Sequence, residues 1–242
     1  MSAKADTIMP GKESFEGIND LITVVIAAKN EEKTIGGIVE KAKKHSSEVI
    51  VVDGHSTDGT SSEAQKRGAL VVQDHHRGKG DAIRTAIPLV SKKITVFMDG
   101  DGSHDPDDIP RLAEPILKGE ADHVSGSRLL GGSSELHGGF DEFLRLMGSS
   151  LITACIGWRF KARLSESQNG FRAIKTDVLK KLDLKENGTT IEQEMIIKTL
   201  KKRFRLAEVP THEYKREFGV SHIRVGRVWL RYIYSLIKNL FF

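Results

Sequence analysis

Two aspartates separated by one residue stand directly after an apolar run, in the segment Asp99-Gly-Asp101-Gly-Ser103-His104. The run, residues 94–98, predicts a buried strand. Two carboxylates at a strand end can hold one hard divalent cation and leave its other positions to phosphates and water, as Mg²⁺ prefers. An acidic surface turn is the alternative, because Asp-Gly pairs are common in turns. An EF-hand loop does not fit, since Pro110 stands where its bidentate glutamate would be.

Two further segments carry groups suited to a nucleotide. Asp53 follows another apolar run and is placed to accept hydrogen bonds from a ribose or a base, while Ser56, Thr57 and Asp58 are suited to capping a turn and a helix. The basic glycine loop 77–80 precedes a predicted helix, so it either brings Lys79 and backbone N–H groups to a phosphate or forms only a turn. The glycine patterns of dinucleotide-binding proteins and of P-loop ATPases are absent from the sequence.

These segments need a sheet to position them. Apolar β-branched runs predict strands at 21–28, 48–52, 69–73, 94–98, 123–127, 170–174 and 205–209. Between and after them we expect helices at 31–44, 60–68, 81–90, 140–156, 191–202 and 225–242, and a glycine-rich loop at 131–139. The alternation predicts an α/β fold with a mainly parallel sheet. Ligands of such sheets bind at the carboxyl ends of the strands, where Asn30, Asp53 and Asp99 fall.

Composition narrows the class of protein. Hydrophobic residues make up 38% of the 242, enough for a buried core, and the single cysteine, Cys155, excludes an internal disulfide framework and fits a reducing compartment. The net charge of +4 is uneven: residues 198–242 carry eleven Lys and Arg against three acids, or +8, which points to phosphates, nucleic acid or an anionic membrane surface. We expect a loosely ordered tail at 1–20, no signal peptide and no membrane-spanning helix.

Seven segments together resemble the glycosyltransferases of family 2, and within them most closely the dolichol- or polyprenyl-phosphate sugar transferases. They are VVIAAKNEE (24–32), VVDGHSTDGT (51–60), RGKGDAIRTAI (77–87), FMDGDGSHDPDDIP (97–110), SGSR (125–128), NGFRAIKTDVL (169–179) and EVPTHEYKREFGVSHIRV (208–225). The resemblance implies a GT-A fold in one domain over residues 21–242. It would comprise a nucleotide-sugar and metal half (21–130), an acceptor half (131–224) and a C-terminal helix (225–242).

The resemblance implies roles for residues in the first half. Asp99 and Asp101 match the D-x-D metal pair, with Ser103 as a further polar contact and Mg²⁺ or Mn²⁺ as the cofactor. Four residues match the segment P-x-Y-N-E, which holds the nucleotide in the family: Ala27, Lys29, Asn30 and Glu31. Asp53 matches the first of two adjacent acids that the family carries further along the chain. Lys29 replaces the usual tyrosine and Gly54 the usual second acid, so the identity of the base stays open.

On the acceptor side, Arg128 matches the arginine of G-S-R, and Arg145 with Ser149 resembles an R-x-x-x-S that holds a lipid phosphate. Arg216, Ser221 and His222 match a hairpin that closes over the diphosphate, with Arg224 as a compensating cation. Surface arginines that only solvate a helix face are the alternative for Arg145. The resemblance also implies inversion at the anomeric carbon, with Lys79 and Arg216 assisting the leaving diphosphate.

A general base is needed only for some acceptors. A sugar hydroxyl must lose a proton as it attacks, whereas a phosphate monoester with a second pKa near ~6 is already largely dianionic at neutral pH. Three acids lie on the acceptor side: Glu166, Glu192 and Glu194. Each can serve as a base, position the donor sugar or bind Arg172 structurally. We rank the positioning and structural roles above the role of a base. We expect Asp101, Arg128, Arg216 and Glu194 to be the catalytic group.

The last eighteen residues predict an amphipathic helix. Tyr232, Ile233, Leu236 and Leu240 share an apolar face with Val225, Val228 and Trp229, while Arg227, Arg231 and Lys238 cluster opposite. Such a helix can lie in a membrane interface, or pack its apolar face on its own domain or on a partner subunit.

We therefore expect a metal-dependent inverting transferase that moves a hexose from a UDP- or GDP-sugar to dolichyl or polyprenyl phosphate. It would be peripheral on the cytoplasmic face of a membrane, with no nucleic-acid partner and with a homodimer left open. A soluble acceptor such as 3-phosphoglycerate is the alternative within enzymes, and a non-catalytic sugar-nucleotide-binding scaffold is the alternative of another class.

Overall fold

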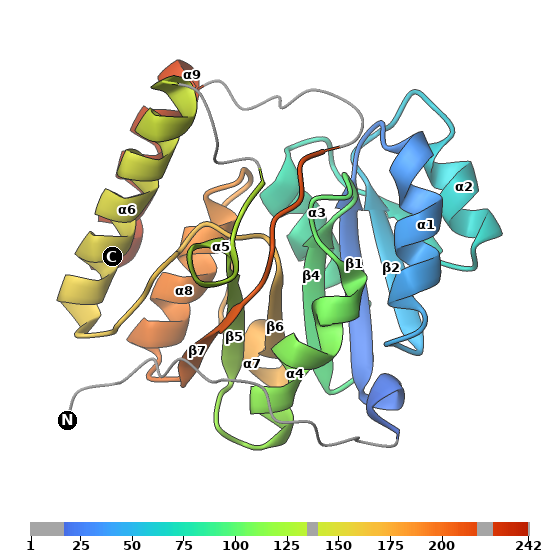
Figure 1. The fold of residues 1–242 in the computed structure, drawn as a ribbon, viewed down its shortest axis with the longest axis horizontal. Coiled ribbons are helices and arrows are strands. Elements are labelled where there is room, and N and C mark those ends of the chain that lie inside the picture. The colour runs from blue at the N-terminus through green and yellow to red at the C-terminus, as the bar shows by residue number, and fades with distance from the viewer. Residues whose placement is uncertain (1–16, 135–139, 217–224, 242) are drawn as a thin grey trace.

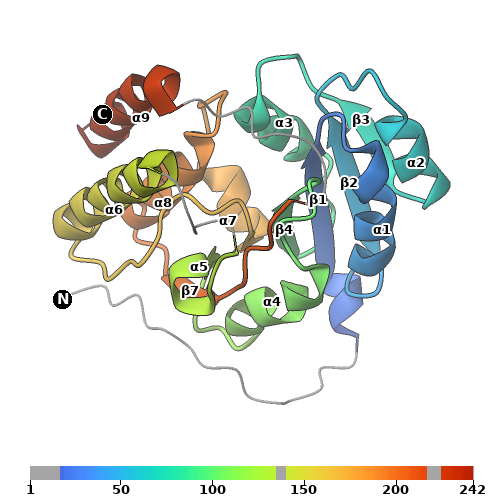
Figure 2. The ribbon, with the colours of Figure 1, turned by 45° about the horizontal axis from the view of Figure 1, so that its top comes forward.

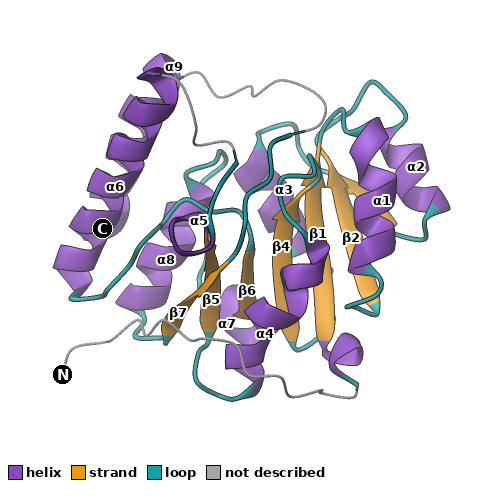
Figure 3. Cartoon of the chain, in the orientation of Figure 1, coloured by secondary structure: helices purple, strands orange, loops and turns teal. Residues whose placement is uncertain are grey.

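The computed structural model describes residues 17–134, 140–216 and 225–241, without the side chains of 140–145 and 225–228. Its strands form one sheet with helices on both faces (Figures 1 and 3). The strands are β1 Ile22–Ala28, β2 Glu48–Asp53, β3 Leu70–Gln73, β4 Ile94–Asp99, β5 His123–Ser127, β6 Arg172–Lys175 and β7 Leu206–Pro210. The helices are η1 Ile18–Leu21, α1 Glu32–Ala42, α2 Thr60–Lys66, α3 Lys79–Ala86, η2 Pro106–Asp108, α4 Ile109–Leu117, α5 Arg128–Gly131, α6 Phe140–Phe160, α7 Thr176–Lys181, α8 Ile191–Lys201 and α9 Val225–Phe241.

The sheet has the order β3-β2-β1-β4-β6-β5-β7, and every pairing is parallel except those of β6. The mainly parallel sheet predicted from the alternation is therefore confirmed. Ala28 pairs with Asp53 and Ala27 with Asp99, so β1, β2 and β4 end together. Because β6 runs the other way, its first residue, Arg172, lies at the same edge of the sheet.

Strands β1, β2 and β4 are buried on both faces, as their continuous apolar runs predict, whereas β3 at the edge of the sheet is partly exposed. Ile22, Val24 and Ile26 of β1 pack with residues of α1, α2 and α4, while Val25 packs with residues of α3, α7 and α8 on the opposite face. Each fully buried aliphatic side chain contributes roughly 1.5–3 kcal/mol, so this double layer supplies most of the stability of the nucleotide half.

Helices α6 and α9 stand beside the sheet and pack against each other and against α8, as Figure 2 shows. Ile152 and Ile156 of α6 meet Leu236 and Leu240 of α9 in a separate apolar cluster that also includes Ile196 of α8. None of the helices in the described part of the chain is long and apolar enough to cross a membrane.

The structure differs from the sequence prediction at several element bounds. The predicted helix 81–90 is α3, which begins at Lys79 and ends at Ala86, and the supposed tail already forms the turn η1 from Ile18. Part of the predicted loop 131–139 lies outside the described residues. Helix α4 was not predicted. Pro110 stands in its first turn, where the missing N–H removes no helical hydrogen bond, and Pro115 lies inside the helix.

Candidate active site

A cavity of about 960 Å³ opens at the edge of the sheet where β1, β2 and β4 end. It begins among the residues that follow these strands, crosses the segment before β6 and reaches helices α6 and α9. Its first part is lined by charged side chains, and its far part by Leu146, Leu151, Ile152, Trp229, Tyr232 and Ile233. The cavity is therefore charged at one end and apolar at the other.

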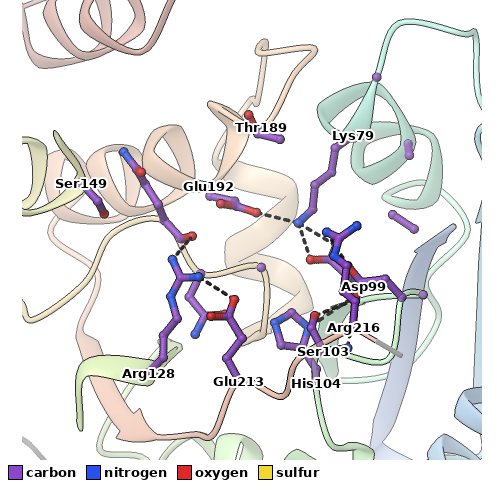
Figure 4. A pocket seen from close by; sticks show the side chains of 18 of the residues that line it. Lys79, Asp99, Ser103, His104, Arg128, Ser149, Thr189, Glu192, Glu213 and Arg216 are labelled. Atoms are coloured by element: carbon purple, nitrogen blue, oxygen red, sulfur yellow. Dashed lines mark hydrogen bonds and ion pairs between the residues drawn. The ribbon is translucent and has the colours of Figure 1, made fainter. Parts of the chain in front are cut away.

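Lys79 bridges two carboxylates at the charged end. Its Nζ lies 2.6 Å from Oδ1 of Asp99 and 2.6 Å from Oε1 of Glu192 (Figure 4). The loop that presents Lys79 is held by the carbonyl oxygen of Asn187, which accepts hydrogen bonds from the backbone of Gly80 (2.8 Å) and of the next residue. Lys79 is thus fixed between the end of β4 and the start of α8.

Asp101 is held from two directions. Its Oδ2 lies 2.6 Å from Nη2 of Arg216, which follows β7. Its Oδ1 accepts hydrogen bonds from Ser103, at 3.0 Å from the backbone nitrogen and 2.6 Å from Oγ. Ser103 therefore orients the Asp101 carboxylate.

His104 is buried beneath the acid pair. Its Nδ1 accepts a hydrogen bond from the backbone N–H of Asp99 at 3.3 Å, and its ring stacks on Phe171 with centroids 5.0 Å apart. Burial lowers the pKa of His104, so the neutral imidazole with its proton on Nε2 is favoured. This ring fixes the backbone from which the Asp99 carboxylate projects.

Arg128 forms a second charged cluster across the cavity from Lys79 and Asp99 (Figure 4). Its Nε donates to Oε1 of Glu166 at 2.5 Å, and its Nη1 to Oε1 of Glu213 at 2.6 Å. Glu213 also accepts a hydrogen bond from Ser133 Oγ at 2.7 Å. Two carboxylates thus hold the guanidinium plane in one orientation.

The pKa values of two acids at the charged end are shifted in opposite directions. Burial opposes ionisation of Asp99, but the Lys79 ammonium outweighs it and lowers the pKa of that carboxyl. Glu31 has no such partner in a described ion pair, and burial together with repulsion from Asp101 raises the pKa of Glu31 to about 7. The charged end therefore holds one carboxylate that stays ionised, Asp99, and one that titrates near neutral pH, Glu31.

The residues present fit a hard divalent cation. Asp99 and Asp101 line the same cavity and offer carboxylate oxygens, the ligands that Mg²⁺ and Mn²⁺ prefer. Among the described residues no group of three or more His, Cys, Asp or Glu is arranged to hold a metal. A cation here would thus take its remaining ligands from substrate phosphates and water.

Most of the residues predicted to form the site do line this cavity. They are Ala27, Lys29, Glu31, Lys79, Asp99, Asp101, Ser103, Arg128, Ser149 and Arg216. Asn30 does not line it; its Oδ1 instead accepts a hydrogen bond from the backbone of Thr57 at 2.8 Å. The structure therefore gives Asn30 a place in the loop that supports the site.

Asp53 does not line the cavity either. It is 1% exposed, its Oδ1 accepts hydrogen bonds from Ser56, and its Oδ2 accepts one from Ser61 Oγ at 2.7 Å. Both carboxylate oxygens are thus engaged within the loop, which contradicts the prediction that Asp53 reads a ribose or base. Asp74, which follows β3, lines the cavity at this end instead.

Glu194 lies away from the cavity, contrary to its predicted catalytic role. Its carboxylate accepts hydrogen bonds from the backbone of Lys185 and Glu186 and pairs with Lys198 at 2.7 Å. Residues two apart on a helix point to nearly opposite sides, so only one of Glu192 and Glu194 can face the site, and that one is Glu192. Glu194 anchors the segment before α8.

The remaining predicted residues are Glu166 and four candidates for phosphate binding. Glu166 pairs with Arg128, so the suggested contact with Arg172 is wrong; Arg172 donates instead to backbone carbonyl oxygens. Arg145 belongs to α6, but its side chain is not described, and Ser221, His222 and Arg224 lie outside the described residues.

Sequence reasoning missed several polar residues of the cavity, among them His104, Gln168 and Glu213. His104 and Glu213 stand inside segments that were singled out for other residues, and Gln168 directly precedes one. Position alone gave no sign of which of them faces inward, except that Glu213 lies three residues before Arg216 on the same segment.

Comparison with known proteins agrees with this geometry. Residues 23–179 match the model of the family described as glycosyl transferase family 2. The chain belongs to this family. Its fold is the GT-A fold, and it is a glycosyltransferase, so the alternative of a non-catalytic scaffold is set aside.

Several individual proteins are similar to this chain. An uncharacterised protein of Methanocaldococcus jannaschii is 34% identical over 84% of this chain and 85% of its own length. A dolichyl-phosphate hexose transferase of Haloferax volcanii is 27% identical over 84% and 87%. Glucosyl-3-phosphoglycerate synthase of Mycobacterium tuberculosis, solved with Mn²⁺, UDP-glucose and phosphoglyceric acid, has a TM-score of 0.78 over 99% and 87% of the chains, at 23% identity.

Proposed function

We propose that this glycosyltransferase moves a hexose from a nucleoside-diphosphate sugar to a polyprenyl phosphate such as dolichyl phosphate. The observation that carries the proposal is the continuity of the cavity from the acid pair to the apolar space between α6 and α9. A nucleotide sugar is polar and gains little from the apolar end of the cavity, whereas each buried CH₂ of a lipid chain contributes roughly 0.8 kcal/mol to binding. The similarity to a dolichyl-phosphate hexose transferase supports the same acceptor.

In the proposed reaction an oxygen of the acceptor phosphate attacks the anomeric carbon, and the bond from that carbon to the diphosphate breaks. The nucleoside diphosphate leaves with the electron pair, and the configuration inverts. Asp99 and Asp101 would hold Mg²⁺ or Mn²⁺, which supplies positive charge to the leaving group. Arg216 and Lys79 lie beside these acids and add cationic hydrogen-bond donors to the same oxygens.

The arrangement of the acids suits a phosphate acceptor. Glu192 is paired with Lys79, and Glu166 and Glu213 are paired with Arg128. These carboxylates orient cations and are not poised to take a proton from a hydroxyl. A phosphate monoester needs no such base, because it is already largely ionised near neutral pH.

Exposed apolar residues on α6 and α9 support attachment to a membrane surface. We keep the cytoplasmic face as the predicted side of that membrane. Tyr232, Leu236 and Leu240, predicted to face the lipid, pack inward instead, so the alternative of packing on the protein's own domain is correct for that face. Other apolar residues of α6 and α9 are more than half exposed: Met147, Leu151, Trp158, Leu230, Tyr234 and Phe241. They would rest in the headgroup region.

One pair of variants separates acceptor binding from membrane attachment. Leu146→Ser removes a half-buried apolar residue that lines the cavity, and Trp158→Ser removes an exposed one on the same helix that does not. With a short polyprenyl phosphate in detergent, Leu146→Ser should raise KM for the acceptor and Trp158→Ser should not. Trp158→Ser should instead weaken flotation with anionic vesicles. If the exposed surface around Trp158 is a dimer interface instead, Trp158→Ser should change the oligomeric state in size-exclusion chromatography and leave flotation unaffected.

Phosphoglycerate is the second candidate acceptor, favoured by the likeness of the fold to glucosyl-3-phosphoglycerate synthase. The deciding experiment incubates the protein with radiolabelled UDP- or GDP-hexose, Mg²⁺ or Mn²⁺, and either polyprenyl phosphate or 3-phosphoglycerate. Label in the organic phase supports the lipid acceptor. Label only in a water-soluble product overturns it.

A further inference from the structure

Gln168 lines the cavity, and its side-chain Nε2 has no hydrogen-bond partner among the described residues. This nitrogen is buried. Buried amide nitrogens are nearly always hydrogen-bonded, because an unsatisfied donor costs about 1–3 kcal/mol. A donor left in this condition beside a substrate cavity points to a partner on the ligand.

The backbone of Gln168 is fixed between the two charged clusters. Its carbonyl oxygen accepts a hydrogen bond from Nη2 of Arg128 at 3.5 Å, and Glu166, two residues earlier, pairs with the same guanidinium. Gly170, two residues later, is packed so closely that a Cβ there would lie 2.6 Å from Lys79 Nζ and 2.8 Å from Asp99 Oδ2. Gln168 therefore occupies the wall between the Arg128 cluster and the acid pair.

The position and chemistry of this amide suit one part of the substrate. In the proposed reaction the leaving diphosphate lies at the acid pair and the acceptor phosphate beside Arg128, so the hexose being transferred lies between them. Phosphates in this cavity have charged donors available in Lys79, Arg128 and Arg216. A neutral amide N–H matches a neutral hydroxyl oxygen instead.

We propose that Gln168 is a positioning residue for the donor sugar, donating from Nε2 to one hydroxyl oxygen of a neutral hexose. The inference rests on the proposed function, since it needs a nucleotide sugar in this cavity. It assigns the choice of sugar in part to the segment before β6, apart from the residues that hold the nucleotide. A site built to hydrogen-bond a hydroxyl discriminates against a sugar that lacks it, because the protein group is then left unpaired.

The test compares donors that differ by one hydroxyl. The wild-type chain and Gln168→Ala would be assayed for kcat/KM with UDP-glucose and GDP-mannose, and then with the monodeoxy forms of whichever donor is used. Wild type should lose roughly 10-fold on removal of one particular hydroxyl. Gln168→Ala should lose a similar factor with the full sugar and be indifferent to that same deletion.

Binding of sugar-free nucleotides distinguishes a contact with the sugar from a general structural role of Gln168. A general structural role would change the affinity for these nucleotides. Affinities for UDP and GDP, measured by calorimetry with Mg²⁺, should be the same for wild type and Gln168→Ala. Gln193→Ala is the matched control: that amide also has an unpartnered atom, Oε1, but it contacts the backbone of Tyr232 and does not line the cavity. It should retain the full sensitivity to the deoxy donor.

The outcomes separate the two proposals. If wild type uses a donor but Gln168→Ala keeps the same sensitivity to every deoxy form, the role of Gln168 is overturned and the proposed function stands. Equal losses for the free nucleotide and the nucleotide sugar also overturn it, since they indicate damage to the whole cavity. If wild type binds neither nucleotide, the proposed function fails and this inference fails with it.

Discussion

Arg216 Nη2 lies 2.6 Å from Asp101 Oδ2, joining the segment after β7 to the end of β4 across the mouth of the cavity. These residues are 115 apart in the sequence, and neither strand neighbours the other in the sheet. The contact brings an always-charged donor to the place where the diphosphate is proposed to leave.

Replacing Arg216 should slow the chemical step more than it weakens binding. Because Arg216 would stabilise charge that develops on the leaving diphosphate, we expect Arg216→Ala to lower kcat by roughly 100-fold. Arg216→Lys should recover only part of this, since an ammonium lacks the planar fork of donors. Arg205→Ala, which removes an exposed arginine bound to Asp122, is the control and should leave kcat unchanged. A change confined to KM would contradict the role in catalysis.

Removal of one metal-binding carboxylate should separate turnover from nucleotide binding. In Asp101→Asn the side chain keeps its shape but loses the charge that holds a divalent cation, so we expect turnover to fall at least ~100-fold. Nucleotide affinity in the presence of EDTA should change little. Wild-type activity should vanish with EDTA and return with Mg²⁺ or Mn²⁺, and an Asp101→Asn variant with normal turnover would refute the metal assignment.

Gly80 should not tolerate a side chain. A Cβ at Gly80 would lie 2.8 Å from the backbone carbon of Asn187, and backbone cannot move aside cheaply. Gly80→Ala should therefore cost about 1–3 kcal/mol in unfolding free energy and displace Lys79. Gly37→Ala is the matched control, because Gly37 is exposed within α1 with nothing near its Cβ position, and it should gain about 0.5–1 kcal/mol. Urea unfolding measures both, and equal shifts would contradict the clash.

His123 should make the fold sensitive to acid. It is fully buried on β5, its Nδ1 lies 2.9 Å from Thr199 Oγ1, and burial, with the charge of Arg172, lowers the pKa of His123 well below its ordinary value of 6.5. Below pH 6.5 the unfolded chain therefore binds a proton that the folded protein does not. Stability should fall as the pH drops below that value, by up to ~1.4 kcal/mol per pH unit from this residue.

The variant His123→Asn tests this assignment. Asparagine cannot titrate but can keep a hydrogen bond to Thr199, so the variant should be less stable than wild type near neutral pH yet lose stability less steeply between pH 6.5 and 5. Unfolding free energies from urea titrations at several pH values give the two slopes. Parallel slopes would show that the acid sensitivity comes from elsewhere.

The strands and the acid pair were predictable because each depends on local pattern. Continuous β-branched runs require burial on both faces, and parallel strands bring their ends to one edge, so Asp99 had to lie near the residues after β1. The partners of those carboxylates were not predictable. Glu213 is 85 residues from Arg128 and Arg216 is 115 from Asp101, and nothing local indicates that these pairs meet.

Two errors have the same physical origin. Periodicity showed that the last helix has an apolar face but not what covers it, and that face packs on α6 and α8. Glu192 and Glu194 were likewise predicted together as acids on the acceptor side, although their spacing puts them on opposite sides of a helix and only Glu192 lines the cavity. Both choices depend on tertiary packing, which a single helical segment does not encode.

Because β6 runs opposite to its neighbours, segments that leave the sheet and a segment that enters it lie at the same edge. Asp99 and Asp101 follow a parallel strand as it leaves the sheet, whereas the stretch from Glu166 to Gly170 precedes β6, which runs antiparallel to its neighbours. Glu166 and Gly170 are tied to Arg128, Lys79 and Asp99, which leaves Gln168 as the position between them that can change. If Gln168 contacts the donor sugar as proposed, exchange of this one residue would alter the preferred sugar while the acid pair stays intact, which gives the scaffold a modular route to new glycans.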